Sequence, residues 1–295
     1  MNCQLPPPLK QGDLLRVITP SGALREWDAF NAGVEIWRSR GYEVELSAGI
    51  KHRWGYLAGI DSDRRKLLLN AWQDPECRGI LCARGGYGSA RILENWTWPQ
   101  VETSKWLIGF SDITALLWSL SSTGISGVHA PVLTTLASEP NWSIERLFDL
   151  LEGRPFAPLK GIGWGGDIAT GILLPANLTV ATHLLGTPFQ PNFDNVILAI
   201  EDVTEAPYRI DRLLTQWRCS GAFSKVRGIA LGRFSRCEPP PNIPSLTIEE
   251  VLRDRLGDLG IPIVSNLPFG HDGCNAALPV GITAQLNADQ GVLSF

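Results

Sequence analysis

Short apolar runs alternate with helix-like stretches along the first half of this chain. Runs with strand character cover residues 14–19, 42–46, 79–83 and 106–110, and helix-like stretches cover residues 28–40, 61–72, 89–95 and 113–120. In the helix-like stretches the apolar residues recur at spacings of three and four, which is typical of amphipathic helices. Strands that alternate with helices predict a parallel sheet with helices on both faces. We therefore expect an α/β fold with its ligand site beyond the carboxyl ends of the strands.

The length of 295 residues favours two domains or one large one. The segment best suited to link two domains is residues 152–167, which is rich in glycine and proline. The sequence thus predicts an N-terminal domain over residues 1–155, a linker over residues 156–166 and a C-terminal domain over residues 167–295.

Charge and hydropathy exclude several classes of function. The net charge of −4 gives no electrostatic footprint for nucleic acid or an anionic membrane. No apolar run reaches the roughly 18 residues of a membrane span, and the N-terminus lacks the features of a signal peptide. The six cysteines are scattered without a CxxC pair, so we expect reduced thiols and no metal. These features predict a cytoplasmic protein with neither nucleic-acid nor membrane partners.

The sequence Gly109-Phe110-Ser111-Asp112 must turn the chain from a strand into a helix within very few residues. A serine on such a turn lies at the first free backbone N–H groups of the helix, where its hydroxyl can be exposed and an oxyanion can be bound. This is the geometry of a nucleophile elbow. Ser111 is therefore the candidate nucleophile.

A nucleophilic serine needs a base and a group that orients the base. Of the four histidines, His271 lies in a loop held by proline and glycines, and His129 follows a strand; both remain candidates for the base. Glu201 directly follows a strongly apolar strand. It is either the orienting carboxylate or a member of an ion-pair network.

The sequence Arg84-Gly-Gly-Tyr-Gly88 follows the third predicted strand. Such a glycine-rich loop can cradle phosphate, although it matches neither a Walker sequence nor a correctly placed GxGxxG. Alternatively, Gly85 and Gly86 let the backbone approach a reacting carbonyl and form part of an oxyanion hole.

Taken together, four motifs resemble the LD-carboxypeptidase family of serine peptidases, the muramoyltetrapeptide carboxypeptidases, to which the microcin-immunity peptidases are related. The motifs are RGGYGSAR (84–91), GFSDIT (109–114), EDVTEAPYRIDR (201–212) and PFGH (268–271), and they occur in the family's order. The resemblance runs over nearly the whole chain. It implies a flavodoxin-like N-terminal α/β domain and a smaller C-terminal α/β domain of the swivelling type.

The resemblance also implies a Ser–Glu–His triad without metal or cofactor. On the matching positions, Ser111 is the nucleophile, His271 the base and Glu201 the orienting group. Glu205 lies in the same motif as Glu201, which leaves open which of the two orients His271. Glu205 is also a candidate substrate-binding residue. The backbone N–H groups of Gly86 and Asp112 are the implied oxyanion donors, and the Asp112 carboxylate is available as a helix cap.

The implied substrate is a cytoplasmic murein tetrapeptide, from which terminal D-alanine is released during cell-wall recycling. Arg84 is a candidate to bind the free C-terminal carboxylate of that substrate. Family resemblance also implies a homodimer. Two alternatives stay open: a microcin-immunity-like enzyme that cleaves a peptidyl-nucleotide amide, and a non-catalytic module that binds a nucleotide through the glycine-rich loop.

Overall fold

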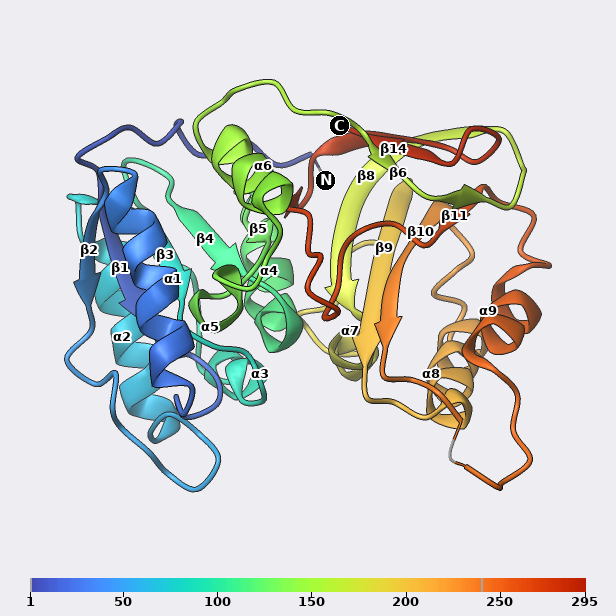
Figure 1. Ribbon diagram of the computed structural model, residues 1–295, viewed down its shortest axis with the longest axis horizontal. Helices are drawn as coiled ribbons and strands as arrows, with labels where there is room; N and C mark the ends of the chain where they lie inside the picture. The colour runs from blue at the N-terminus through green and yellow to red at the C-terminus, as the bar shows by residue number, and fades with distance from the viewer. Residues whose placement is uncertain (1, 240) are drawn as a thin grey trace. The chain divides into compact units, whose positions relative to one another are not determined.

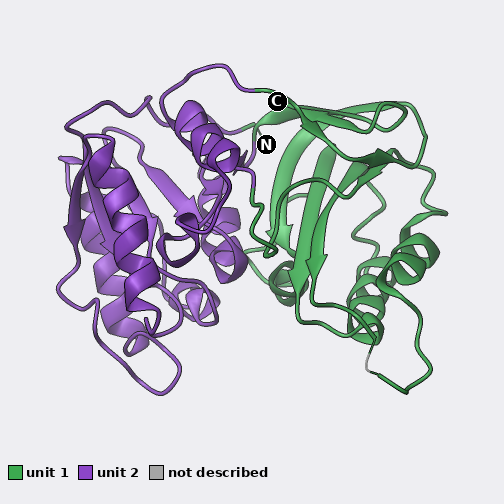
Figure 2. Ribbon diagram, viewed as in Figure 1, with its two compact units in different colours: residues 1–2, 157–275, 282–295 green, residues 3–156, 276–281 purple. Residues whose placement is uncertain are grey.

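The computed structural model describes residues 2–239 and 241–295 (Figure 1). It divides into two compact units (Figure 2). Unit 2 comprises Cys3–Phe156 and the short segment Ala276–Gly281, whereas unit 1 comprises Ala157–Asn275 and Ile282–Phe295 together with Asn2. The chain therefore contributes to unit 2 a second time, just after the PFGH motif.

Unit 2 is built on a parallel sheet with one antiparallel edge strand. Its strands are β1 (Leu14–Ile18), β2 (Glu43–Leu46), β3 (Cys77–Cys82), β4 (Trp106–Gly109), β5 (Val128–His129) and β12 (Leu278–Pro279). They lie in the order β2-β1-β3-β4-β5-β12, and only β12 runs antiparallel to its neighbour. The parallel part has the flavodoxin-like order 2-1-3-4-5, which confirms the predicted fold class.

Helices cover both faces of this sheet (Figure 1). They are α1 (Trp27–Ser39), α2 (Asp61–Gln73), α3 (Ser89–Leu93), the 3₁₀ helix η1 (Ser111–Ile113), α4 (Thr114–Ser121), α5 (Leu133–Leu136) and α6 (Asn141–Leu151). On one face, Trp37 of α1 packs against Phe148 of α6 with ring centroids 4.7 Å apart, above the buried Val17 of β1. Trp72 of α2 is fully buried. These apolar contacts anchor the strands whose carboxyl ends carry the predicted site.

Unit 1 is the smaller unit and is also α/β. Its strands are β6 (Leu159–Lys160), β7 (Ile162–Gly163), β8 (Ile168–Asn177), β9 (Val196–Val203), β10 (Val226–Ser235), β11 (Ile263–Ser265), β13 (Thr283–Asn287) and β14 (Val292–Ser294), in the order β6-β14-β13-β8-β9-β10-β11-β7. Its helices are α7 (Leu178–Leu184), α8 (Pro207–Cys219) and α9 (Ile248–Leu256). Strands β8 to β11 are parallel. The predicted linker, residues 156–166, contains β6 and β7, which pair with β14 and β11.

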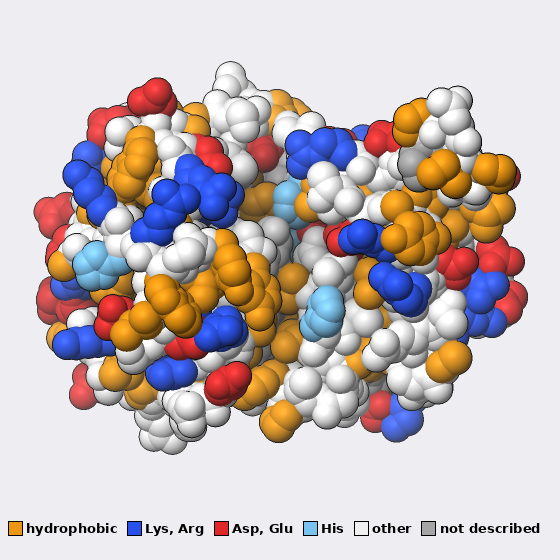
Figure 3. Space-filling view, turned by 90° about the horizontal axis from the view of Figure 1, so that it is seen from below, with side chains coloured by type: hydrophobic (Ala, Val, Ile, Leu, Met, Phe, Trp, Pro, Cys, Tyr) orange, Lys and Arg blue, Asp and Glu red, His pale blue; other side chains and the backbone are white. Residues whose placement is uncertain are grey.

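Acidic and basic side chains are interspersed over the face shown in Figure 3. Across residues 2–239 and 241–295, no helix is both long enough and apolar enough to cross a membrane. In the same part of the chain, histidine, cysteine and carboxylate side chains form no group of three that could hold a metal ion. Cys3, Cys77, Cys82, Cys219 and Cys237 are free thiols.

Candidate active site

Ser111 lies where β4 passes into η1 and α4, and it is half-buried. Its φ of 63° is in the left-handed region, which costs a residue other than glycine about 1–3 kcal/mol. The turn is tight because Gly109 lacks a side chain; a Cβ there would lie 2.9 Å from Ile113 Cγ1. A strained serine at the start of a helix matches the predicted nucleophile elbow.

The glycine-rich loop passes directly beside Ser111. A Cβ added to Gly85 would lie 3.3 Å from Ser111 Oγ, a tight contact that glycine avoids. The loop is held from its other side, where Gly22 donates its N–H to Gly85 O at 3.2 Å. The next residue, Gly86, has a φ of 112°, which favours glycine. The backbone, rather than a side chain, is therefore what this loop presents to Ser111.

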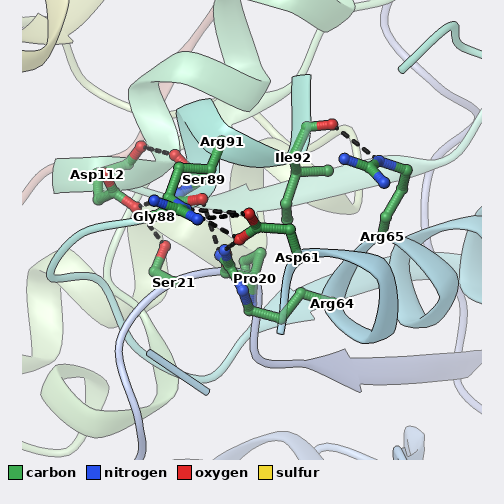
Figure 4. A network of polar contacts seen from close by, with 10 residues as sticks. All are labelled: Pro20, Ser21, Asp61, Arg64, Arg65, Gly88, Ser89, Arg91, Ile92 and Asp112. Atoms are coloured by element: carbon green, nitrogen blue, oxygen red, sulfur yellow. Dashed lines mark hydrogen bonds and ion pairs between the residues drawn. The ribbon is translucent and has the colours of Figure 1, made fainter. Parts of the chain in front are cut away.

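Asp112 uses its carboxylate to fix the neighbouring loops (Figure 4). Its Oδ2 accepts hydrogen bonds from Ser21 Oγ at 2.5 Å and from the Ser89 N–H at 2.8 Å. Ser89 begins α3, so the carboxylate binds the first turn of that helix and makes no side-chain cap of its own helix. The side chain of Asp112 thereby ties the Ser111 turn to the ends of β1 and β3.

A buried arginine holds the same loops from the other side (Figure 4). Arg64 of α2 is fully buried and donates through Nη1 to Pro20 O and, at 2.7 Å, to Gly88 O. Its charge is paired with Asp61, which also binds Arg91 at 2.7 Å. These bonds connect the loop after β1 to the loop after β3. The sequence pattern did not single out Arg64, because an arginine in an amphipathic helix is usually exposed to solvent.

Arg84, the expected carboxylate-binding cation, already has a partner. Its Nε lies 3.0 Å from Glu26 Oε2. Although partial burial opposes the effect, the hydrogen bond from Arg84 lowers the pKa of the Glu26 carboxyl. Arg84 can therefore bind a substrate carboxylate only in competition with Glu26.

In unit 1, Glu201 and His271 form a close pair. Glu201 is completely buried at the end of β9, and its Oε2 lies 2.6 Å from His271 Nδ1. A carboxylate at this distance accepts a hydrogen bond from Nδ1–H, so Nε2 keeps its lone pair. A general base requires this tautomer of the imidazole. Glu205, the second carboxylate of the motif, instead pairs with Arg209 at 3.4 Å. The structure thus brings Glu201, and not Glu205, to His271.

The His271 loop is held against the end of β10. Leu267 N–H donates to Leu231 O at 3.0 Å, and Arg233 N–H donates to Phe269 O at 2.8 Å. A Cβ on Gly232 would lie 2.5 Å from the Phe269 ring, so this approach requires glycine. The loop reaches Glu201 because two adjacent parallel strands, β9 and β10, end side by side.

A cavity of about 720 Å³ within unit 1 reaches His271. Trp164 lines it on one side, and the guanidinium carbon of Arg253 lies 4.4 Å from the centroid of its ring. Arg233 and Arg236 add two further cations. The histidine is therefore accessible to a polar ligand from within its own unit.

The other histidine weighed as a base lies in a different environment. His129 is completely buried in β5, with its ring edge-on to Phe110 at a centroid distance of 5.7 Å. His271, by contrast, has the Glu201 carboxylate hydrogen-bonded to its ring.

A second buried carboxyl group adjoins Glu201. Asp202 is 2% exposed and accepts hydrogen bonds from the Thr179 hydroxyl at 2.8 Å and from the Val203 N–H at 2.7 Å. Burial and, to a lesser degree, the charge of Glu201 raise its pKa to about 6. Sequence reasoning missed Asp202, although its place next to Glu201 at a buried strand end was a usable signal.

This pKa predicts how Asp202 affects stability. The folded state binds the Asp202 proton more tightly than the unfolded chain, whose aspartates have a pKa of about 3.9. The stabilising contribution is therefore complete below about pH 4 and is lost as the pH rises through about 6, a change on the order of 3 kcal/mol. We expect the unfolding free energy of the wild type minus that of Asp202→Asn, from urea titrations, to fall by this amount between pH 4 and 7. A difference that does not vary with pH would contradict the assignment.

Comparison with known families matches both units. The model of the LD-carboxypeptidase N-terminal domain matches residues 15–130, and that of the LD-carboxypeptidase C-terminal domain matches residues 170–286. The chain is 62% identical to a putative carboxypeptidase of Synechocystis sp., over 98% of this chain and 96% of the relative. It is 31% identical to a murein tetrapeptide carboxypeptidase of Pseudomonas aeruginosa, over 93% of each chain.

Solved structures show the same fold. The crystal structure of a muramoyltetrapeptide carboxypeptidase from Oxalobacter formigenes aligns with a TM-score of 0.85 at 27% identity, covering 95% of this chain and 97% of the other. The microcin immunity protein MccF in complex with glutamyl sulfamoyl guanosine aligns with a TM-score of 0.87 over 99% and 98% of the two chains. At 20% identity, this second likeness concerns the fold alone.

Proposed function

This chain belongs to the LD-carboxypeptidase family of serine peptidases, and we propose that it releases terminal D-alanine from murein tetrapeptides. The bond cut is the amide between the L-centre of the diamino acid and D-alanine. A Bacillus subtilis relative, at 32% identity, is named a probable murein peptide carboxypeptidase, and a Pseudomonas aeruginosa relative, at 31% identity, a murein tetrapeptide carboxypeptidase. The buried Glu201 on His271 Nδ1 is the single observation that carries the chemistry of the proposal.

In the proposed reaction, Ser111, His271 and Glu201 act as one triad. His271 Nε2 takes the Ser111 proton while Oγ attacks the carbonyl carbon, and Glu201 stabilises the imidazolium that forms. The N–H groups of Gly86 and Asp112 bind the oxyanion of the tetrahedral intermediate. His271 then gives its proton to the leaving amine of D-alanine, and an ester remains on Ser111. Water, deprotonated by His271, hydrolyses this acyl-enzyme and restores the serine.

The glycines beside Ser111 support this assignment over a phosphate site. Gly85 passes so close to Ser111 that an added Cβ would lie 3.3 Å from Oγ, which suits a reacting carbonyl held between the loop and the helix start. We further propose that the reaction serves cell-wall recycling in the cytoplasm and that the chain acts as a homodimer, as the family resemblance implies.

The experiment offers the purified protein two substrate classes. One is the free tetrapeptide L-Ala-γ-D-Glu-diamino acid-D-Ala, with diaminopimelate or lysine at the third position; the other is an aminoacyl sulfamoyl adenosine. We expect release of D-alanine from a tetrapeptide and much slower cleavage of the nucleotide analogue. Rapid cleavage of the analogue alone would favour a microcin-immunity-like activity, and cleavage of neither would contradict the proposal. Light scattering on the same sample tests the homodimer.

A further inference from the structure

Asn177 lies at the point where two buried carboxyl groups meet. It ends β8, and its register partner on the parallel strand β9 is Glu201. Its side chain is 4% exposed, and its Nδ2 lies 3.3 Å from Glu201 Oε1 and 3.2 Å from Asp202 Oδ1. An amide NH₂ has two hydrogens to donate, so this one group can serve both carboxyls at once.

The orientation of this amide is fixed from its other end. Asn177 Oδ1 accepts the Val180 N–H at 3.1 Å and thereby caps α7. A flip of the amide would face its NH₂ toward a backbone donor and its oxygen toward two carboxyl groups, and all three contacts would be lost. The cap therefore determines that the donor side of Asn177 faces Glu201 and Asp202.

The two oxygens of Glu201 thus have different partners. Oε1 accepts from Asn177, whereas Oε2 faces His271 Nδ1 at 2.6 Å. A glutamate side chain has three rotatable bonds, and Asp202 next to it repels it when both carboxyls are charged. A donor placed on Oε1 opposes both effects because it restricts the rotation and offsets part of the repulsion between the two carboxylates.

We propose that Asn177 is a positioning residue for the proposed reaction: its amide holds the Glu201 carboxylate in the orientation in which Oε2 accepts a hydrogen bond from His271 Nδ1–H. The proposal rests on the proposed function. In this role Asn177 acts through Glu201. The same side chain caps α7, so Asn177 links the start of this helix to Glu201.

Asn177→Ser is the principal test, because serine is itself a good helix cap but is too short to reach the carboxyl groups. We expect kcat for D-alanine release to fall about 10- to 100-fold with KM within about twofold, the usual cost of losing a group that orients a ligand or base. The acid limb of the kcat profile should move to higher pH, because Asp202, whose pKa burial already raises, loses a donor that favours its charged form. The matched control is Thr247→Ala, which removes the side-chain cap of α9 and its capping box. It should lower Tm and leave kcat and its pH profile as in the wild type.

A measurement without substrate separates this inference from the proposed function. The His271 Nδ1 proton signal in the NMR spectrum of the free protein should move upfield in Asn177→Ser and stay in place in Thr247→Ala. If the wild type cleaves no tetrapeptide, the proposed function fails, and the NMR comparison still decides the role of Asn177.

A near-isosteric variant covers a failure of Asn177→Ser to fold. Asn177→Asp keeps the cap oxygen and replaces the donor with a third carboxylate oxygen, so it should lower kcat at neutral pH at least as much as Asn177→Ser. Unchanged kcat, pH profile and Nδ1 proton signal in whichever variant folds would overturn the inference.

Discussion

Replacement of Ser111 by alanine is expected to abolish release of D-alanine from murein tetrapeptide and to leave the fold intact. Alanine removes only the hydroxyl, so the Gly85 approach and the start of α4 stay as they are. Loss of a triad member lowers kcat on the order of 10⁴- to 10⁶-fold, and the residual rate comes from the oxyanion donors and substrate binding. D-alanine release under saturating tetrapeptide, followed over hours, measures the loss.

Two further variants sharpen this test. Ser138→Ala is the matched control: Ser138 is an exposed serine of the same unit whose hydroxyl donates to Thr135 O at 2.7 Å, and the change should leave kcat as in the wild type. Ser111→Gly should be equally inactive and more stable by about 1 kcal/mol, because glycine adopts a φ of 63° without strain. Full activity in Ser111→Ala would rule out a serine nucleophile at this position.

Glu201→Gln is expected to lower kcat on the order of 10³- to 10⁴-fold with little change in KM. The size of the side chain is kept, but the charge that stabilises the imidazolium is lost. The Asn177 donor selects the oxygen of the new amide at the Oε1 position, so the NH₂ faces His271 Nδ1. That arrangement places the imidazole proton on Nε2, where it blocks removal of the Ser111 proton.

Comparison with other carboxyl groups decides whether position or charge matters. Asp194→Asn, at an exposed ion pair with Lys225, should leave kcat as in the wild type. Glu205→Gln should cost less than about tenfold, because Glu205 pairs with Arg209 and not with His271. If Glu205→Gln lost as much activity as Glu201→Gln, the carboxyl next to His271 would not be the orienting group. Steady-state kinetics on all three variants at one pH provides the measurement.

Much of the fold followed from local patterns. The periodicity over residues 28–40 and 61–72 predicted α1 and α2 to within one residue at each end. Apolar runs placed β1 and β4, and the alternation of elements predicted a parallel sheet with helices on both faces. These features are predictable because hydrophobic spacing depends on neighbours a few positions away.

Contacts between segments that are distant in the sequence could not be predicted in the same way. Residues 156–166 have the composition of a linker, yet they contain β6 and β7, whose partners β14 and β11 lie more than 100 residues further along the chain. Arg64 is of a residue type that is usually exposed on a helix. It is buried here because carbonyl groups of two other loops accept its hydrogen bonds. The amino-acid type gives only a tendency toward burial, whereas the actual burial of a side chain depends on the groups that pack against it.

The sequence by itself determined the α/β class, the tight turn at Ser111 and the short set of candidate partners, because glycine spacing and the scarcity of histidines are local facts. Only the tertiary structure showed that His271 contacts Glu201 and not Glu205. Glu201 lies within β9, whereas Glu205 lies beyond its end. The tertiary structure also revealed that Asn177 faces both Glu201 and Asp202. The physical reason is that hydrogen-bond geometry acts within about 3 Å, whereas the parallel strands that bring these groups to that distance are separated by long stretches of chain.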